Sequence, residues 1–119
     1  TFSSLKRGGC TLMGNTAADI AAKAEANGAA AVGANCGDLT PEQYAQIVTS
    51  MHEACSLPIL LQPNAGKPKR EGKQAVYPLG PAEFAQQMQS CYAAGARILG
   101  GCCGTTPAHI AALVQSLKA

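Results

Sequence analysis

The sequence predicts an α/β fold in which parallel strands alternate with helices. Three short apolar runs, at residues 30–36, 58–64 and 98–99, each adjoin glycine or proline, as expected of buried parallel strands. Segments with apolar residues at helical spacing lie before, between and after these runs. A pattern of glycine and cysteine at the end of the first run returns 67 residues later, at the end of the third. Such an internal repeat is typical of repeating parallel architectures.

The size and charge of the chain exclude several classes of protein. Its 119 residues leave room for one ordinary domain. The net charge is +2, and no basic block with interleaved aromatic residues occurs, so we expect no nucleic-acid partner. No apolar run reaches the ~20 residues that span a bilayer, and the N-terminus lacks the pattern of a signal peptide. We therefore expect a cytoplasmic protein that does not contact a membrane.

The chain begins in an irregular, glycine-rich loop, and the first helix is expected over residues 17–27. Thr16 and Asp19 form a plausible cap pair at its start, and Gly28 ends it. The apolar face of this helix is thin and made of small residues, which predicts close packing. The first strand, residues 30–36, follows directly.

The second helix has the clearest signals in the chain. Thr40 and Gln43 form a capping box, and Pro41 occupies the first helical position. Its predicted apolar face consists of Tyr44, Ile47, Val48, Met51 and Cys55. The next strand, residues 58–64, is a continuous apolar run that ends in the polar Asn64.

Residues 65–80 are rich in glycine, proline and charge, and they predict a long exposed loop. A third helix is expected from Pro81 to just before Gly95. Its apolar stripe consists of Phe84, Met88, Cys91 and Tyr92. After the last strand, Thr106 and Pro107 are typical of a helix start. The apolar face of that helix consists of Ile110, Leu113, Val114 and Leu117.

Six cysteines could indicate a disulfide scaffold, but the alanine-rich, helical character of the chain disfavours one. Cys55 and Cys91 lie on apolar helix stripes and are predicted to be core residues. Cys10 lies in a loop and is left unassigned. His52 and His109 fall off the main apolar stripes, and we expect both to be solvated.

The remaining cysteines, Cys36, Cys102 and Cys103, lie at the ends of corresponding strands. Strands two apart in a closed barrel share a layer of side chains, so these three thiols can meet at one point. Thiolates favour zinc over magnesium or calcium, and three protein ligands with an open fourth position are typical of catalytic zinc. Asn64 ends the intervening strand and is a candidate fourth ligand, unless it only forms the turn before residues 65–66.

Two other interpretations stay open at this point. The glycine-rich strand ends lead into helix N-termini, which is also the pattern of a phosphate site. A non-catalytic, zinc-stabilised module would use similar cysteines but would require a closed fourth position.

Three motifs resemble the C-terminal portion of the homocysteine S-methyltransferase domain, most closely the cobalamin-dependent methionine synthase type. They are Gly-Ala-Asn-Cys at 33–36, Gln-Pro-Asn-Ala-Gly at 62–66 and Gly-Gly-Cys-Cys-Gly-Thr-Thr-Pro-Ala-His-Ile at 100–110. The resemblance implies a zinc-dependent (β/α)₈ TIM barrel that transfers a methyl group to the thiol of homocysteine, giving methionine. It makes Cys36, Cys102 and Cys103 the zinc ligands and places Asn35 and Gly101 in the substrate site.

A complete barrel takes roughly 250 residues, so residues 1–119 would form only its C-terminal half, from about the end of strand five to helix eight. We then expect the chain to need the missing half or to self-associate, and to be incomplete as an enzyme by itself. In this interpretation zinc binds the homocysteine sulfur and lowers the pKa of its thiol, so that a thiolate attacks the methyl group. The resemblance implies methylcobalamin, with corrinoid and 5-methyltetrahydrofolate modules as partners, whereas other family members use betaine or S-methylmethionine.

Overall fold

The computed structural model describes residues 1–118. In chain order its elements are η1 (Lys6–Gly8), α1 (Ala17–Ala26), β1 (Val32–Asn35), α2 (Pro41–Ala54), β2 (Ile59–Gln62), β3 (Lys69–Glu71), β4 (Gln74–Val76), α3 (Pro81–Ala94), β5 (Ala96–Leu99) and α4 (Pro107–Lys118). The predicted alternation of helices and strands is confirmed, although β1 and β2 are shorter than expected at their ends. No helix in residues 1–118 has both the length and the apolar character that crossing a membrane would require.

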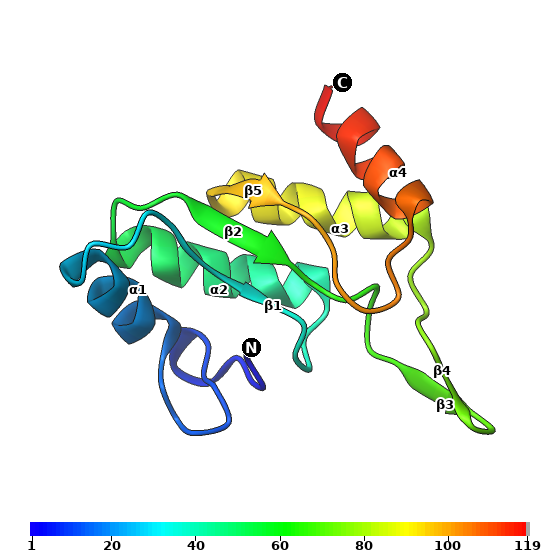
Figure 1. The fold of residues 1–119 in the computed structure, drawn as a ribbon, viewed down its shortest axis with the longest axis horizontal. Helices are drawn as coiled ribbons and strands as arrows, with labels where there is room; N and C mark the ends of the chain where they lie inside the picture. The colour runs from blue at the N-terminus through cyan, green and yellow to red at the C-terminus, as the bar shows by residue number, and fades with distance from the viewer. Residues whose placement is uncertain (119) are drawn as a thin grey trace.

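The main sheet has three parallel strands in the order β1-β2-β5 (Figure 1). Val32 pairs with Ile59 and Asn35 pairs with Gln62, which brings the carboxyl ends of β1 and β2 level. On the other side of β2, Leu61 pairs with Leu99. The two strands that lead to the cysteines therefore flank β2, as the 67-residue repeat predicts.

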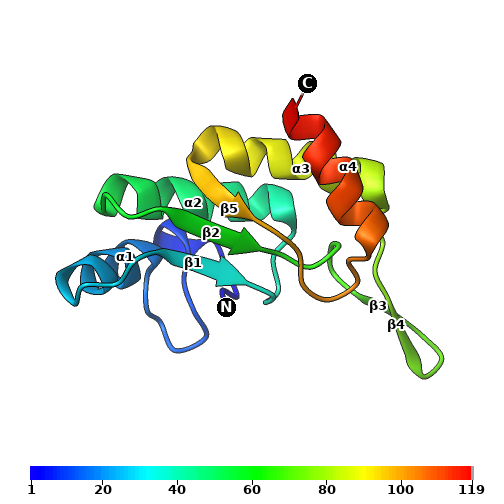
Figure 2. The same cartoon turned by 45° about the horizontal axis from the view of Figure 1, so that its top comes forward.

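The helices cover one face of this sheet. α2 and α3 lie side by side behind the strands, with α1 packed on α2 and α4 packed on α3 (Figures 1 and 2). The predicted capping box of α2 is formed: Gln43 N–H donates to the Thr40 hydroxyl oxygen, and Thr40 N–H donates to the Gln43 side chain. Its predicted face is buried at Tyr44, Ile47, Val48 and Met51, whereas Cys55 is half-buried just beyond the helix.

The opposite face of the sheet is not covered by a helix within residues 1–118 (Figure 2). Because side chains alternate along a strand, Ile59 and Leu61 point to the helices and are buried. Leu60 and its partner Ile98 point the other way, and Ile98 is 45% exposed. Apolar faces of parallel sheets are normally covered, so the exposure of Ile98 is unusual for such a strand.

Four expectations are corrected by the structure. Part of the predicted loop 65–80 forms the antiparallel hairpin β3–β4, whose short strands lie fully at the surface and so leave no apolar pattern to detect. Tyr92 is exposed rather than part of a buried stripe, and its ring carries the Arg97 guanidinium 4.2 Å from the centroid. His109 is buried, only 6% exposed, rather than solvated. On α4 only Leu113 of the predicted apolar face is buried, since the other three residues find no partner element in the described chain.

Candidate metal centre

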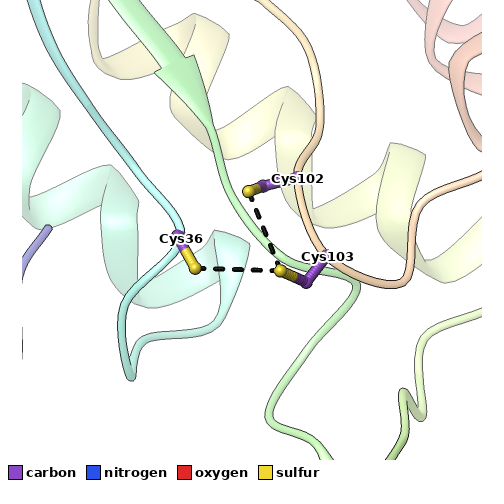
Figure 3. Close-up of side chains that lie close together, drawn as sticks. All are labelled: Cys36, Cys102 and Cys103. Atoms are coloured by element: carbon purple, nitrogen blue, oxygen red, sulfur yellow. Dashed lines mark hydrogen bonds between the residues drawn. The ribbon is translucent and has the colours of Figure 1, made fainter.

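Three thiols converge at the carboxyl end of the sheet. The sulfur atoms of Cys36, Cys102 and Cys103 all lie within 4.8 Å of one another (Figure 3). Cys103 is central, because its sulfur lies 3.9 Å from that of Cys36 and 3.9 Å from that of Cys102. Cys10, Cys55 and Cys91 do not belong to this group. The predicted convergence of the three thiols is thus present.

Cys36 lies in the turn immediately after β1. Its φ of +54° lies in the left-handed region, which costs a non-glycine residue roughly 1–2 kcal/mol. Hydrogen bonds at both ends of the residue hold this conformation. Cys36 N–H donates to Gln62 O over 3.1 Å, and the Tyr44 hydroxyl donates to Cys36 O over 2.7 Å.

Cys102 and Cys103 lie on the loop between β5 and α4, and this loop runs along the continuation of β2. Gly100 N–H donates to Leu61 O, and Cys102 N–H donates to Pro63 O, both over 2.9 Å. The Thr105 hydroxyl donates to Cys102 O over 2.7 Å and closes the turn. Backbone bonds to β2 therefore fix where this loop passes the end of the sheet.

Asn64 joins the two cysteine-bearing loops. The residue is 3% exposed; its Oδ1 accepts the Cys103 N–H over 3.0 Å, and its Nδ2 donates to Gly37 O over 3.2 Å. Asn64 is therefore more than a residue of its own turn. Its side chain bridges the two loops that carry the thiols.

Tyr77, directly after the hairpin β3–β4, lies next to the Cys103 thiol. The Tyr77 ring, just after β4, packs on Gly104, where a side chain would collide with it and where φ is +81°. Burial and the adjacent Cys103 thiol raise the pKa of Tyr77. At the root of the hairpin, Leu79 O faces the buried His109 Nε2 at 2.8 Å.

The two predicted substrate residues lie beside the thiols. Asn35 is the last residue of β1, directly before Cys36, and is exposed. Gly101 directly precedes Cys102 and is half-buried, and a side chain at this position would collide with Thr105. Both residues therefore lie next to the thiol cluster in sequence, and their contact with a substrate stays a prediction.

The electrostatics of the cluster favour a bound cation. The Gly37 N–H hydrogen bond to its sulfur lowers the pKa of Cys36, although burial opposes this shift. Hydrogen bonds with Cys36 and Cys102 and the proximity of their charges raise the pKa of Cys103. The first thiolate, at Cys36, is thus stabilised by its neighbours, whereas its charge opposes ionisation of Cys103. A cation between the sulfur atoms would offset this repulsion.

The geometry of the sulfur atoms fits zinc. Zn–S bonds of about 2.3 Å in a tetrahedron place sulfur atoms about 3.8 Å apart. Two of the pairs in the cluster are 3.9 Å apart, and the third needs to close by less than about 1 Å. Soft thiolate ligands select zinc rather than magnesium or calcium. The donor set and its spacing therefore suit a zinc ion with three protein ligands.

The sequence analysis did not identify the bond from Tyr44 to Cys36 O or the buried position of His109 at the root of the hairpin. Burial raises the pKa of Tyr44 to about 12, so its hydroxyl remains a hydrogen-bond donor. A buried tyrosine signals a partner for its hydroxyl, but sequence alone does not identify that partner. His109 Nδ1 faces both the hydroxyl (2.9 Å) and the N–H (3.2 Å) of Thr106, three residues before it at the start of α4. That spacing was the available signal.

The fold and the thiol cluster together describe a parallel α/β protein with a candidate thiolate metal centre at the carboxyl ends of its strands. The sequence profile described as Homocysteine S-methyltransferase matches residues 1–117. The chain belongs to the homocysteine S-methyltransferase family, and the resemblance drawn from the three motifs is confirmed.

Two curated relatives illustrate the relationship. The methionine synthase of Mycobacterium tuberculosis is 35% identical over 114 residues, which are 92% of this chain and 10% of that protein. The homocysteine S-methyltransferase of Escherichia coli is 36% identical over 85 residues, which are 70% of this chain and 27% of that protein. The chain thus spans about a tenth to a quarter of the length of these relatives.

Solved structures agree with this assignment. The apo form of the homocysteine methyltransferase MmuM from Escherichia coli superposes with a TM-score of 0.69 at 28% identity, over 95% of this chain and 37% of that one. Its metallated form gives a TM-score of 0.69 at 27% identity, over 99% of this chain and 34% of that one. The α/β fold with alternating parallel strands is similar to part of those enzymes.

Proposed function

We propose that Cys36, Cys102 and Cys103 bind one zinc ion and that this site serves methyl transfer to the thiol of homocysteine, giving methionine. The observation that carries the proposal is the sulfur spacing, 3.9 Å for two pairs, which suits tetrahedral thiolate coordination of zinc. Membership of the homocysteine S-methyltransferase family supports the choice of reaction.

A zinc ion held by Cys36, Cys102 and Cys103 would supply a Lewis acid that keeps the homocysteine sulfur as a thiolate near neutral pH. In the transfer, a sulfur lone pair forms the new S–CH₃ bond while the bond between the methyl carbon and its donor breaks. The chain's own residues position the reactants. Asn64 fixes the spacing of the two cysteine loops, and Asn35 and Gly101, beside the thiols, contact the substrate.

Asn64 also remains our candidate for a fourth ligand that yields to homocysteine. Its Oδ1 already accepts the Cys103 N–H, and an amide oxygen has a second lone pair for a metal. X-ray absorption of the zinc-loaded chain should show three sulfur neighbours and one lighter atom at rest. Four sulfur neighbours before substrate is added would instead favour a closed, non-catalytic zinc module.

The methyl donor in this proposal is a methylcorrinoid, methylcobalamin, that is recharged from 5-methyltetrahydrofolate. The match to the methionine synthase of Mycobacterium tuberculosis supports this choice over a small donor. The corrinoid and folate modules would then be partners, together with homocysteine. Methyl transfer from methylcobalamin but not from S-methylmethionine, by a reconstituted full-length enzyme, is the expected result.

We also propose that residues 1–119 are the C-terminal half of a (β/α)₈ barrel, from about the end of strand five to helix eight. The uncovered sheet face supports this, as does the match to only 37% of the MmuM chain. The isolated chain should self-associate in sedimentation velocity. Ile98→Lys, on the uncovered face, should raise the monomer fraction, whereas Leu12→Lys, in the N-terminal loop, should not. A sharp monomer with a cooperative melt would contradict the half-barrel.

Zinc content tests the metal site directly. The reduced chain should bind about one zinc ion, and serine at Cys36, Cys102 or Cys103 should sharply reduce zinc retention. Serine at Cys55 or Cys91 is the matched control and should leave zinc bound. Equal losses from all five variants would indicate general unfolding and would refute the ligand assignment.

A further inference from the structure

The conformation of Cys36 is unusual. Among residues 1–118 only Arg7 and Cys36 are non-glycine residues with positive φ. Side chains rarely adopt this region, so surrounding contacts must hold the residue there. In this conformation the Cys36 side chain points across the end of the sheet toward Cys103 (Figure 3).

The contact at the carbonyl end of Cys36 comes from a helix rather than from the sheet. Tyr44 lies in the first turns of α2, is fully buried, and donates its hydroxyl proton to Cys36 O over 2.7 Å. The capping box at Thr40 fixes the start of this helix. The tyrosine hydroxyl therefore reaches Cys36 from a rigid element.

The Tyr44 hydroxyl also accepts a hydrogen bond, from the N-terminal segment. It accepts the Phe2 N–H at 3.4 Å, and the Phe2 ring meets the Tyr44 ring edge-on, with centroids 6.4 Å apart. Asp38 N–H donates to Phe2 O over 3.1 Å and returns the chain to the same turn. Tyr44 thus links the N-terminal segment, α2 and the turn that carries Cys36.

We infer that Tyr44 is a positioning residue of the metal centre, whose hydroxyl holds Cys36 in the left-handed conformation that directs its sulfur toward Cys103. This inference rests on the proposed zinc site. Without the hydroxyl, Cys36 can relax toward the extended region, which is lower in energy for a side chain at that position. The sulfur then leaves the spacing that zinc requires.

Tyr44→Phe removes only the hydroxyl and keeps the buried ring. Loss of such an outer partner typically weakens metal binding by 10–100-fold, and the lower end applies because Tyr44 contacts the backbone of the ligand rather than its sulfur. We expect the zinc dissociation constant, measured by chelator competition, to rise about tenfold. In the cobalt-substituted chain the thiolate charge-transfer and d–d bands should shift.

Ser50→Ala is the matched control. Ser50 lies on the same helix and donates to Gly8 O over 2.8 Å, so the variant also removes one hydroxyl bond to a backbone carbonyl. It should leave zinc affinity and the cobalt spectrum unchanged. If Ser50→Ala weakens zinc binding as much as Tyr44→Phe does, a general softening of α2 explains both results and the inference is overturned.

The metal-free chain provides a second readout. The Cα and Cβ chemical shifts of Cys36 report its backbone conformation, and in Tyr44→Phe they should move toward extended values. Buried Cys91 should stay protected from alkylation, which shows that the variant is folded. Unchanged shifts together with unchanged zinc affinity would refute the role of Tyr44.

If Tyr44→Phe does not fold, the unmodified chain still answers the question. The Tyr44 hydroxyl proton should exchange with water much more slowly than that of exposed Tyr92, and fast exchange would overturn the inference. Failure of the zinc proposal can be distinguished from failure of the proposed role of Tyr44. If the unmodified chain binds no zinc, the proposed function fails, while the Cys36 shifts still test the contact with Tyr44.

Discussion

Asn64→Ala tests whether a single side chain sets the spacing of the two thiol loops. The substitution leaves two buried or half-buried groups without partners, namely the Cys103 N–H and the Gly37 carbonyl. An unsatisfied group of this kind costs about 1–3 kcal/mol, and partial access to water favours the lower part of that range. We therefore expect the free energy of unfolding to fall by about 2–3 kcal/mol.

The assay is equilibrium urea unfolding of the metal-free chain at one fixed protein concentration, because self-association would couple stability to concentration. The midpoint should fall with little change in slope. Asn27→Ala is the control: Asn27 also donates to a carbonyl, Lys23 O at 2.7 Å, but lies exposed at the end of α1. That variant should lose less than about 0.5 kcal/mol.

The zinc affinity of Asn64→Ala is the second measurement of this test. The three thiols remain, so zinc should stay bound to Asn64→Ala at stoichiometric concentration. Its affinity should fall about tenfold, because the loops are no longer joined and the candidate fourth ligand is lost. A stability loss no larger than that of Asn27→Ala, with unchanged zinc affinity, would show that backbone bonds alone position the loops.

Three further results are expected. His109→Ala should lower the free energy of unfolding by about 3 kcal/mol, since it leaves Leu79 O unpaired and removes the ring packed edge-on against Phe84; urea unfolding measures this. Burial raises the pKa of Cys91 to about 12, so above pH 9 the unfolded thiol ionises while the folded one stays protonated. Stability should then fall by up to about 1.4 kcal/mol per pH unit toward pH 12, and Cys91→Ala should remove that share of the pH dependence. Gly104→Ala should displace Tyr77 and lower the melting temperature.

Sequence patterns predicted the alternating elements and the meeting of the three thiols for clear physical reasons. Apolar period and caps mark the helices and the three strands of the main sheet locally, as at Thr40 and Thr106. The 67-residue repeat then places Cys36 and Cys103 at the ends of corresponding strands, and these ends lie on the same edge of a parallel sheet. Both kinds of signal depend on residue type and spacing, which the sequence contains.

Contacts between residues that are far apart in the sequence were not predictable in the same way. Tyr44 has the spacing of an ordinary core residue, and its bond to Cys36 depends on how α2 is placed against the turn after β1. The burial of His109 depends on where the hairpin root brings Leu79 O. The strands of the hairpin itself are fully exposed, so no apolar alternation marks them. These features arise from tertiary packing, which periodicity does not encode.

The extension of β2 explains why the thiols can be arranged before any ligand enters. Gln62 O accepts from Cys36, Pro63 O accepts from Cys102, and Ala65 N–H donates to Cys103 O over 3.0 Å. Each bond uses the backbone rather than a thiol, so the loops keep their places whatever the sulfur atoms hold. In small zinc-dependent domains, by contrast, metal binding supplies much of the folding free energy. Replacing one thiol here should therefore sharply reduce zinc binding while leaving the sheet and helices folded, as the proposed catalytic rather than structural role of the metal requires.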